Sequence, residues 1–148
     1  MRTIALRFSD NFAPPDGTIA EHRKCIYKKG FVWYGKLGSP VSERVCTELL
    51  ENESPRFLLI HSGKSARYWA YTDRIIKSVP ALEDVPEYYR FQADSFRTWF
   101  RLIDIEEADK SVMSRCRVAS SGMLLSIASR SSMSPYFIID YTDDEART

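Results

Sequence analysis

Residues 56–79 read RFLLIHSGKSARYWAYTDRIIKSV, and this stretch points to a fold built on β-strands. Arg56–His61 is a short apolar run that ends at turn residues, which is typical of a buried strand. Ser62–Ser65 has the composition of a tight turn, and Arg67–Val79 is rich in aromatic and β-branched side chains that favour strands. The stretch therefore predicts a β-hairpin whose second strand is the longer one.

Further strands are expected on both sides of this hairpin. Each candidate is a short segment of alternating or continuous apolar residues, and glycine, proline or polar residues separate it from the next segment. These strands are predicted at Thr3–Phe8, Phe31–Lys36, Phe96–Ile105 and Tyr136–Tyr141.

Two helices are predicted between the strands. The first begins at Ser39–Pro40, because a serine side chain caps free backbone N–H groups and proline suits the first helical position; it ends near Asn52. The second is capped at Ser120–Ser121 and runs through Ala128. His22–Lys29 fits either a short helix or the approach to a strand.

About six strands and two or three short helices predict an α+β fold, in which a small curved β-barrel carries helices on its openings. We expect a single domain over residues 1–148, with a frayed polar tail from about residue 142. The predicted core contains Val32, Leu49, Leu58, Ile60, Leu102 and Ile138.

Composition excludes several classes of protein. The formal net charge of +1 does not indicate a strongly basic nucleic-acid binder, although Lys110–Ile139 contains bases and no acid. That segment fits either a solvated face or a functional basic surface. The cysteines Cys25, Cys46 and Cys116 are far apart and odd in number, so they predict neither a disulfide framework nor a zinc site. With no signal peptide and no long apolar run, a cytoplasmic protein without a membrane segment is expected.

Signatures of catalysis are weak. Gly63-Lys64-Ser65 matches the end of a phosphate-binding loop, but the earlier glycine is missing and the turn lies between two strands instead of before a helix. His22 and His61 have no carboxylate at the spacing of a metal site, and Cys25 near His22 is weak support for a nucleophile. We therefore expect no catalytic residue, no metal and no cofactor.

Aromatic residues on the predicted strands suggest a binding site instead. Trp33, Trp69 and Trp99 all fall on strand candidates, and alternation places Trp99 on the same face as Arg97 and Arg101. Because a buried unpaired arginine is costly, this face is either an edge-strand surface with arginine stems packed on the indole, or a partly open pocket. In such a pocket, aromatic rings stack on a flat ligand and basic groups contact phosphate.

The order of these segments resembles that of a known group of proteins. A GFVWYGK strand is followed by a capped helix, a FLLIHSG–RYWAY hairpin, a TWFRL strand, and a late SSG segment before YFII. This order is similar to that of the PUA-like superfamily, and within it to the EVE and YTH-like branch. The resemblance implies a small curved barrel with an aromatic pocket that recognises a nucleobase, often a modified one. It also implies a partner, because bacterial modules of this kind are often fused to restriction nucleases or motor ATPases.

The leading hypothesis is therefore a non-catalytic module that reads a modified base in nucleic acid, DNA more than RNA, as part of a modification-dependent restriction system. A base enclosed between aromatic rings must still satisfy its donors and acceptors, which short hydroxyls and an imidazole at strand and helix ends can do. The predicted aromatic walls are Trp33, Trp69 and Trp99, the predicted polar readers are His61, Ser62 and Ser121, and the predicted phosphate contacts are Arg97, Arg101 and Arg117.

Two other functions stay open at this point. A protein–protein adaptor can use the acidic loop Glu83–Glu87 together with Tyr88 and Tyr89. A small-molecule enzyme is the third alternative. A concave aromatic pocket beside basic surface favours the reader, whereas a flat apolar patch without a pocket favours the adaptor.

Overall fold

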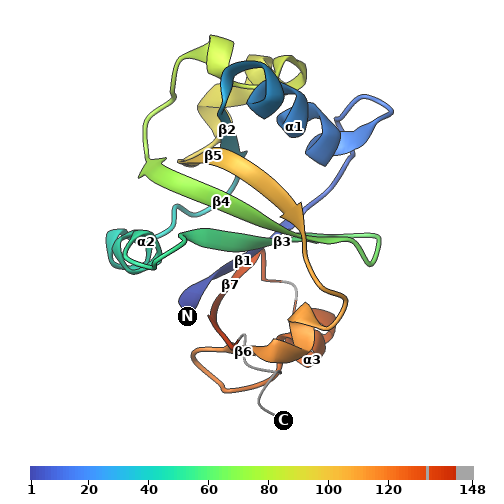
Figure 1. Ribbon diagram of the computed structural model, residues 1–148, viewed down its shortest axis with the longest axis vertical. Helices are drawn as coiled ribbons and strands as arrows, with labels where there is room; N and C mark the ends of the chain where they lie inside the picture. Colours follow the sequence, from blue (N-terminus) through green and yellow to red (C-terminus); the bar gives the residue numbers. More distant parts are fainter. Residues whose placement is uncertain (133, 143–148) are drawn as a thin grey trace.

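A single sheet runs through the whole molecule (Figure 1). The structure, a computed structural model, describes residues 1–132 and 134–142. Within these residues the strand order is β2-β5-β4-β3-β1-β7-β6; β1 and β3 run parallel, and the other neighbouring pairs are antiparallel. The strands are β1 Arg2–Phe8, β2 Val32–Lys36, β3 Arg56–His61, β4 Arg67–Ile76, β5 Thr98–Glu107, β6 Cys116–Val118 and β7 Tyr136–Tyr141.

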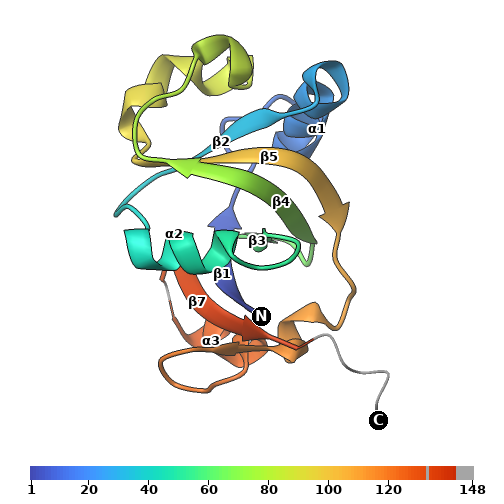
Figure 2. The ribbon, with the colours of Figure 1, turned by 60° about the vertical axis from the view of Figure 1, so that its left-hand side comes forward.

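The sheet is curved and open, with β2 and β6 as its edges (Figure 2). Part of the curvature arises between β4 and β5, where the register shifts on both sides of Thr72. Such bulges bend a strand and increase its twist. The predicted α+β class and the small curved sheet are thus confirmed. The described residues hold seven strands where about six were predicted, because Cys116–Val118 also pairs with β7.

Short helices cover the ends of this sheet. Figure 1 shows α1 beside β2 and β5 at one end, and α3 beside β6 at the other. None of the described helices is both long enough and apolar enough to cross a membrane. The helices are α1 Gly17–Lys29, α2 Glu43–Leu50 and α3 Leu125–Ser131, with the 3-10 segments η1 Leu82–Asp84, η2 Glu87–Ser95 and η3 Val112–Arg115.

Both predicted helix starts are wrong by a few residues. Helix α2 begins after Ser42, whose Oγ accepts a hydrogen bond from the Val45 N–H at 3.3 Å, so Ser42 and not Ser39 is the cap. Near Ser121 the chain turns through Gly122, which has a φ of 75°, and α3 starts only at Leu125. The positive φ suits glycine, and Arg117 pairs with Leu124 across the turn. The serines there form a turn instead of a helix cap.

Most of the predicted core is confirmed. Val32, Leu49, Leu58, Ile60 and Leu102 are buried, whereas Ile138 is only partly buried. Along β7 the fully buried positions alternate with partly buried ones, so Ile138 lies on the less enclosed face of this strand. The predicted tail from about residue 142 lies, apart from residue 142 itself, outside the described residues.

Candidate ligand-binding site

A cavity of about 230 Å³ lies where the end of β1, the start of α1, β2 and η2 come together. Sites for drug-sized ligands occupy roughly 300–1,000 Å³, so this cavity suits one ring system. Its wall is rich in aromatic rings and also carries two cations and several polar groups. The aromatic residues are Phe8, Phe12, Tyr34, Tyr88, Tyr89 and Phe96; the cations are Arg7 and Lys36; the polar residues include Ser9, Thr18, His22 and Gln92.

Gly35 allows the two sides of the cavity to approach each other. It lies on β2 opposite Trp99 of β5, and a Cβ atom added to it would lie 2.7 Å from Cγ of Phe96 and 3.0 Å from the Trp99 ring. Real Cβ atoms do not come so close to other heavy atoms. The absence of a side chain at Gly35 therefore lets the Phe96 ring pack directly on the β2 backbone beside Tyr34.

Tyr34 offers a hydrogen-bonding group with no partner. Its side chain lines the cavity and is only 8% exposed, yet its hydroxyl makes no hydrogen bond with any described residue. Burial raises its pKa above the ordinary value, so the hydroxyl stays protonated. The hydroxyl borders the cavity instead of being enclosed by the protein, so a ligand there that accepts a hydrogen bond can become its partner.

His22 is a structural support behind the cavity. Its ring is 1% exposed; Nδ1 donates to the Thr18 carbonyl at 2.8 Å, and Nε2 accepts from the Tyr89 hydroxyl at 3.0 Å. A carbonyl can only accept, which fixes this tautomer. Burial lowers the pKa of His22 to about 4, so the ring is neutral at pH 7. The Tyr89 hydroxyl also receives the Gly35 N–H at 3.3 Å, which ties α1, η2 and β2 together.

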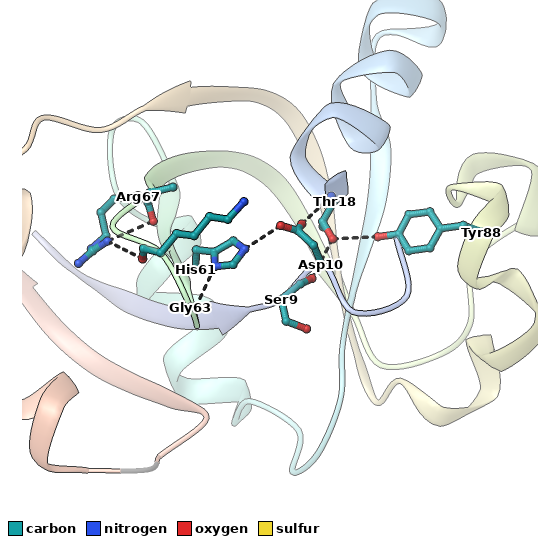
Figure 3. A network of polar contacts seen from close by, with 9 residues as sticks. Ser9, Asp10, Thr18, His61, Gly63, Arg67 and Tyr88 are labelled. Carbon is teal, nitrogen blue, oxygen red and sulfur yellow. Dashed lines mark hydrogen bonds and ion pairs between the residues drawn. The ribbon is translucent and has the colours of Figure 1, made fainter. Parts of the chain in front are cut away.

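His61 lies at the centre of a chain of polar contacts that reaches the cavity (Figure 3). Its Nδ1 accepts from the Gly63 N–H at 2.9 Å, and its Nε2 donates to Oδ2 of Asp10 at 2.7 Å. Asp10 Oδ1 accepts from the Thr18 N–H at 2.9 Å, and the Tyr88 hydroxyl donates to Thr18 Oγ1 at 3.3 Å. The predicted polar reader His61 is therefore connected to the cavity wall, although its own ring does not line the cavity.

Asp10 is the anionic member of this chain of contacts. Desolvation opposes its ionisation, but the hydrogen bonds from the Thr18 N–H and from His61 outweigh that effect. The pKa of Asp10 is therefore lowered, and its carboxylate remains charged at neutral pH. The charge fixes the loop after β1 against the first turn of α1, and thereby positions Ser9 and Thr18 at the cavity.

The three tryptophans are not walls of this cavity. Trp33 and Trp99 are buried in one cluster with Tyr89 and Phe96, whereas Trp69 is buried in another cluster, 4.9 Å from the Tyr141 ring centroid. Trp99 is 0% exposed and has no free face on which a base can stack. The structure thus does not bring the three indoles together, and Trp33 and Trp99 support the cavity from behind through Tyr89 and Phe96.

Arg101 explains why the sequence argument about Trp99 fails. The guanidinium of Arg101 pairs with Asp73 at 2.7 Å and lies 4.3 Å from the Phe31 ring centroid. A long side chain can carry its charge out of the core while its stem follows apolar surface. An arginine two residues away therefore does not prevent Trp99 from being fully buried.

The other predicted site residues are spread over the molecule. Ser62 is exposed at the β3–β4 turn, where its N–H donates to the Phe8 carbonyl at 2.8 Å. Ser121 lies in the turn between β6 and α3, and its Oγ accepts from the Met123 N–H. Arg97 is exposed next to Phe96, and its N–H donates to the Lys36 carbonyl. Arg117 lies on β6, at the opposite edge of the sheet from β2. These residues do not form one continuous surface for phosphate.

Sequence reasoning missed the residues that do line the cavity, above all Tyr34 and Lys36. The signal was present in the strand, because alternation placed Tyr34 on the opposite face from Trp33, and a glycine follows it. A glycine inside a strand often marks a close approach of other groups to the backbone. Trp33 itself is buried in a core cluster with Tyr89 and Trp99.

Comparison with known proteins fixes the family. The family model described as Pua-like matches residues 4–137, which is most of the chain. The chain belongs to the Pua-like family. This membership confirms the superfamily that the sequence resembled, and it points to a module that binds nucleic acid or a modified base. Domains of this kind are generally non-catalytic. No curated protein and no solved structure matches the chain.

Proposed function

We propose that this Pua-like domain is a non-catalytic reader that encloses a nucleobase, and specifically a modified one, in the cavity beside Tyr34. The observation that carries the proposal is the combination of aromatic walls with the unpartnered Tyr34 hydroxyl. Aromatic rings stack on any base, and each stacked base adds roughly 1–3 kcal/mol to the binding free energy. A hydroxyl donor then distinguishes between bases by the acceptors on their edges. The size of the cavity suits one base as the group that its aromatic rings enclose.

To enter this cavity from a duplex, the base must leave the helical stack, as it does in enzymes that act on single bases. We therefore propose DNA with an extruded modified base as the target. Arg97 is exposed next to Phe96 and is placed to contact the backbone outside the cavity. The resemblance to the EVE and YTH-like branch supports a role as the recognition part of a restriction system, with a nuclease or an ATPase as its partner.

The adaptor alternative loses its proposed contact residues. Tyr89 is buried, and Tyr88 is partly buried with its hydroxyl on Thr18. Asp84 of the acidic loop pairs with Lys29 at 3.0 Å, so part of its charge is used within the chain. Both tyrosines line the cavity, and only Tyr88 keeps part of its surface exposed.

A panel titration tests the reader function. Oligonucleotides that contain plain, methylated or hydroxymethylated bases are titrated against the wild type, Ala13→Trp and Ala81→Trp. Ala13 is a partly buried loop residue at the cavity, so a tryptophan there is expected to block entry, whereas Ala81 is exposed in another loop outside the cavity. We expect one class of modified base to bind the wild type and Ala81→Trp equally, and Ala13→Trp at least tenfold more weakly. If the oligonucleotides bind all three proteins with the same affinity, the cavity is excluded as the binding site.

Removing the free hydroxyl gives a second prediction. Tyr34→Phe is expected to leave the free energy of unfolding within about 0.5 kcal/mol of the wild type, because the hydroxyl has no protein partner to lose. Binding of the preferred oligonucleotide is expected to weaken by about 1 kcal/mol, roughly fivefold in Kd, through loss of one hydrogen bond. Tyr27→Phe is the matched control, because Tyr27 is exposed on α1 and outside the cavity. If the Kd of Tyr34→Phe equals that of the wild type, the Tyr34 hydroxyl takes no part in base recognition.

A further inference from the structure

Lys36 is a buried cation without an acidic partner. Its side chain lines the cavity and is 6% exposed, and no carboxylate of the described residues lies within ion-pair distance of Nζ. Nζ donates to the carbonyls of Leu37 at 3.0 Å and Ser39 at 2.7 Å, and lies 4.7 Å from the ring centroid of Tyr136. An ammonium group has three protons, so one donor remains free, and carbonyls and an aromatic ring offset the charge only in part. Buried charges are normally paired.

Arg7, the other cation beside this cavity, points to the opposite face of the sheet. Along β1 it alternates with Leu6 and Phe8, and its guanidinium lies 5.7 Å from the ring centroid of Phe137, where it donates to the carbonyls of Ser129, Ser132 and Ser134. The Tyr136 ring that Lys36 contacts packs on the same side as Leu6 and Phe8. The charge of Arg7 is therefore not added to that of Lys36.

Lys36 supplies positive charge at one side of the cavity, where Pro135 lines the wall and the Tyr136 ring lies against Nζ. Tyr88 and Tyr89 of η2, and Phe96 directly after it, contribute the aromatic rings.

We propose that Lys36 forms an anion subsite that holds the phosphate of the nucleotide whose base fills the aromatic part of the cavity. The proposal rests on the reader function for the base, and it makes a nucleotide, not a free base or nucleoside, the complete ligand. A phosphate is an anion with several acceptor oxygens, so it matches both the charge and the free donor of the Lys36 ammonium. Desolvation lowers the pKa of Lys36, and a bound anion is expected to raise it.

The test compares a nucleoside with its own 5′-monophosphate, for the base that the oligonucleotide panel selects, and with inorganic phosphate alone. Calorimetric titrations use the wild type, Lys36→Met, Lys36→Arg and Lys28→Met in a buffer without other multivalent anions. Lys28 is exposed on α1 and outside the cavity, so Lys28→Met removes the same charge elsewhere. We expect the wild type to bind the monophosphate at least tenfold more tightly than the nucleoside. Lys36→Met should abolish this preference, while Lys36→Arg and Lys28→Met keep it.

The outcomes separate the subsite from the base-reader function. Equal binding of nucleoside and monophosphate by the wild type overturns the anion subsite and leaves the reader function standing. Binding of inorganic phosphate that is lost in Lys36→Met, in a protein that binds no oligonucleotide of the panel, supports the subsite and overturns the reader function. If Lys36→Met does not fold, the NMR signals of the wild-type Lys36 side chain and Tyr136 ring decide the matter. Their shift with added inorganic phosphate supports the subsite, and unchanged signals overturn it.

Discussion

Trp99→Ala is expected to lower the free energy of unfolding by about 3–5 kcal/mol, which is the usual cost of removing a large buried aromatic side chain. Trp99 is fully enclosed, packs edge-on against Phe96 at a centroid distance of 5.3 Å, and lies parallel to the Tyr89 ring at 6.4 Å. The deletion leaves a void behind the cavity that these rings can fill only in part. Urea unfolding followed by circular dichroism measures the change.

Phe91→Ala provides the control for this substitution. Phe91 lies on η2 near the same cluster but is 81% exposed, so its removal is expected to change stability by less than about 0.5 kcal/mol. A core role for Trp99 would be contradicted if Trp99→Ala were as stable as the wild type and had lost binding of the modified base. That result would restore Trp99 as a wall of the binding pocket.

The stability of the domain is expected to fall steeply between pH 6.5 and pH 4 because of His22. The pKa of His22 is about 4 in the folded chain and about 6.5 in the unfolded chain, so the unfolded state binds more protons throughout this range. Stability therefore rises with pH here, and it is lost as the pH falls from 6.5 towards 4. A slope of up to about 1.4 kcal/mol per pH unit gives a total of roughly 3 kcal/mol.

His22→Gln is the variant that isolates this effect. Glutamine can still donate to the Thr18 carbonyl but does not titrate, so the pH dependence between 4.5 and 6.5 should largely disappear. Asp10 does not interfere in this window. Its lowered pKa gives stability that is present above its ordinary value of 3.8 and is lost only as the pH falls through the lower folded value. An equally steep profile in His22→Gln assigns the acid sensitivity to another group.

Strands proved easier to predict than helices in this chain. The hairpin of β3 and β4 and the closing strand Tyr136–Tyr141 follow from alternation and turn residues, which are local properties of the sequence. Helix α1 was left open because its apolar residues are few, and it is held instead by tertiary contacts: Asp10 receives the Thr18 N–H and His22 contacts Tyr89. Such contacts join residues distant in sequence, so no local pattern predicts them.

The family was predictable, but the binding residues were not. The order of segments was enough to indicate the Pua-like family, since it depends on the succession of elements alone. The cavity depends on which face of each strand is covered, and η2, for which the sequence predicts no helix or strand, supplies Tyr88 and Tyr89. Trp33, Trp69 and Trp99 attracted attention by residue type, whereas burial against η2 and β7 makes them core residues.

The most direct test of the base-binding cavity is an NMR measurement on the complex with the tightest oligonucleotide of the panel. Intermolecular nuclear Overhauser effects between the protons of the modified base and the protein report contacts at short range. We expect them at the rings of Phe8, Tyr34 and Phe96, and not at the indole rings of Trp69 and Trp99. Effects confined to the exposed residues of α3 or the β6 edge, with none at the Tyr34 ring, would contradict a base enclosed in this cavity.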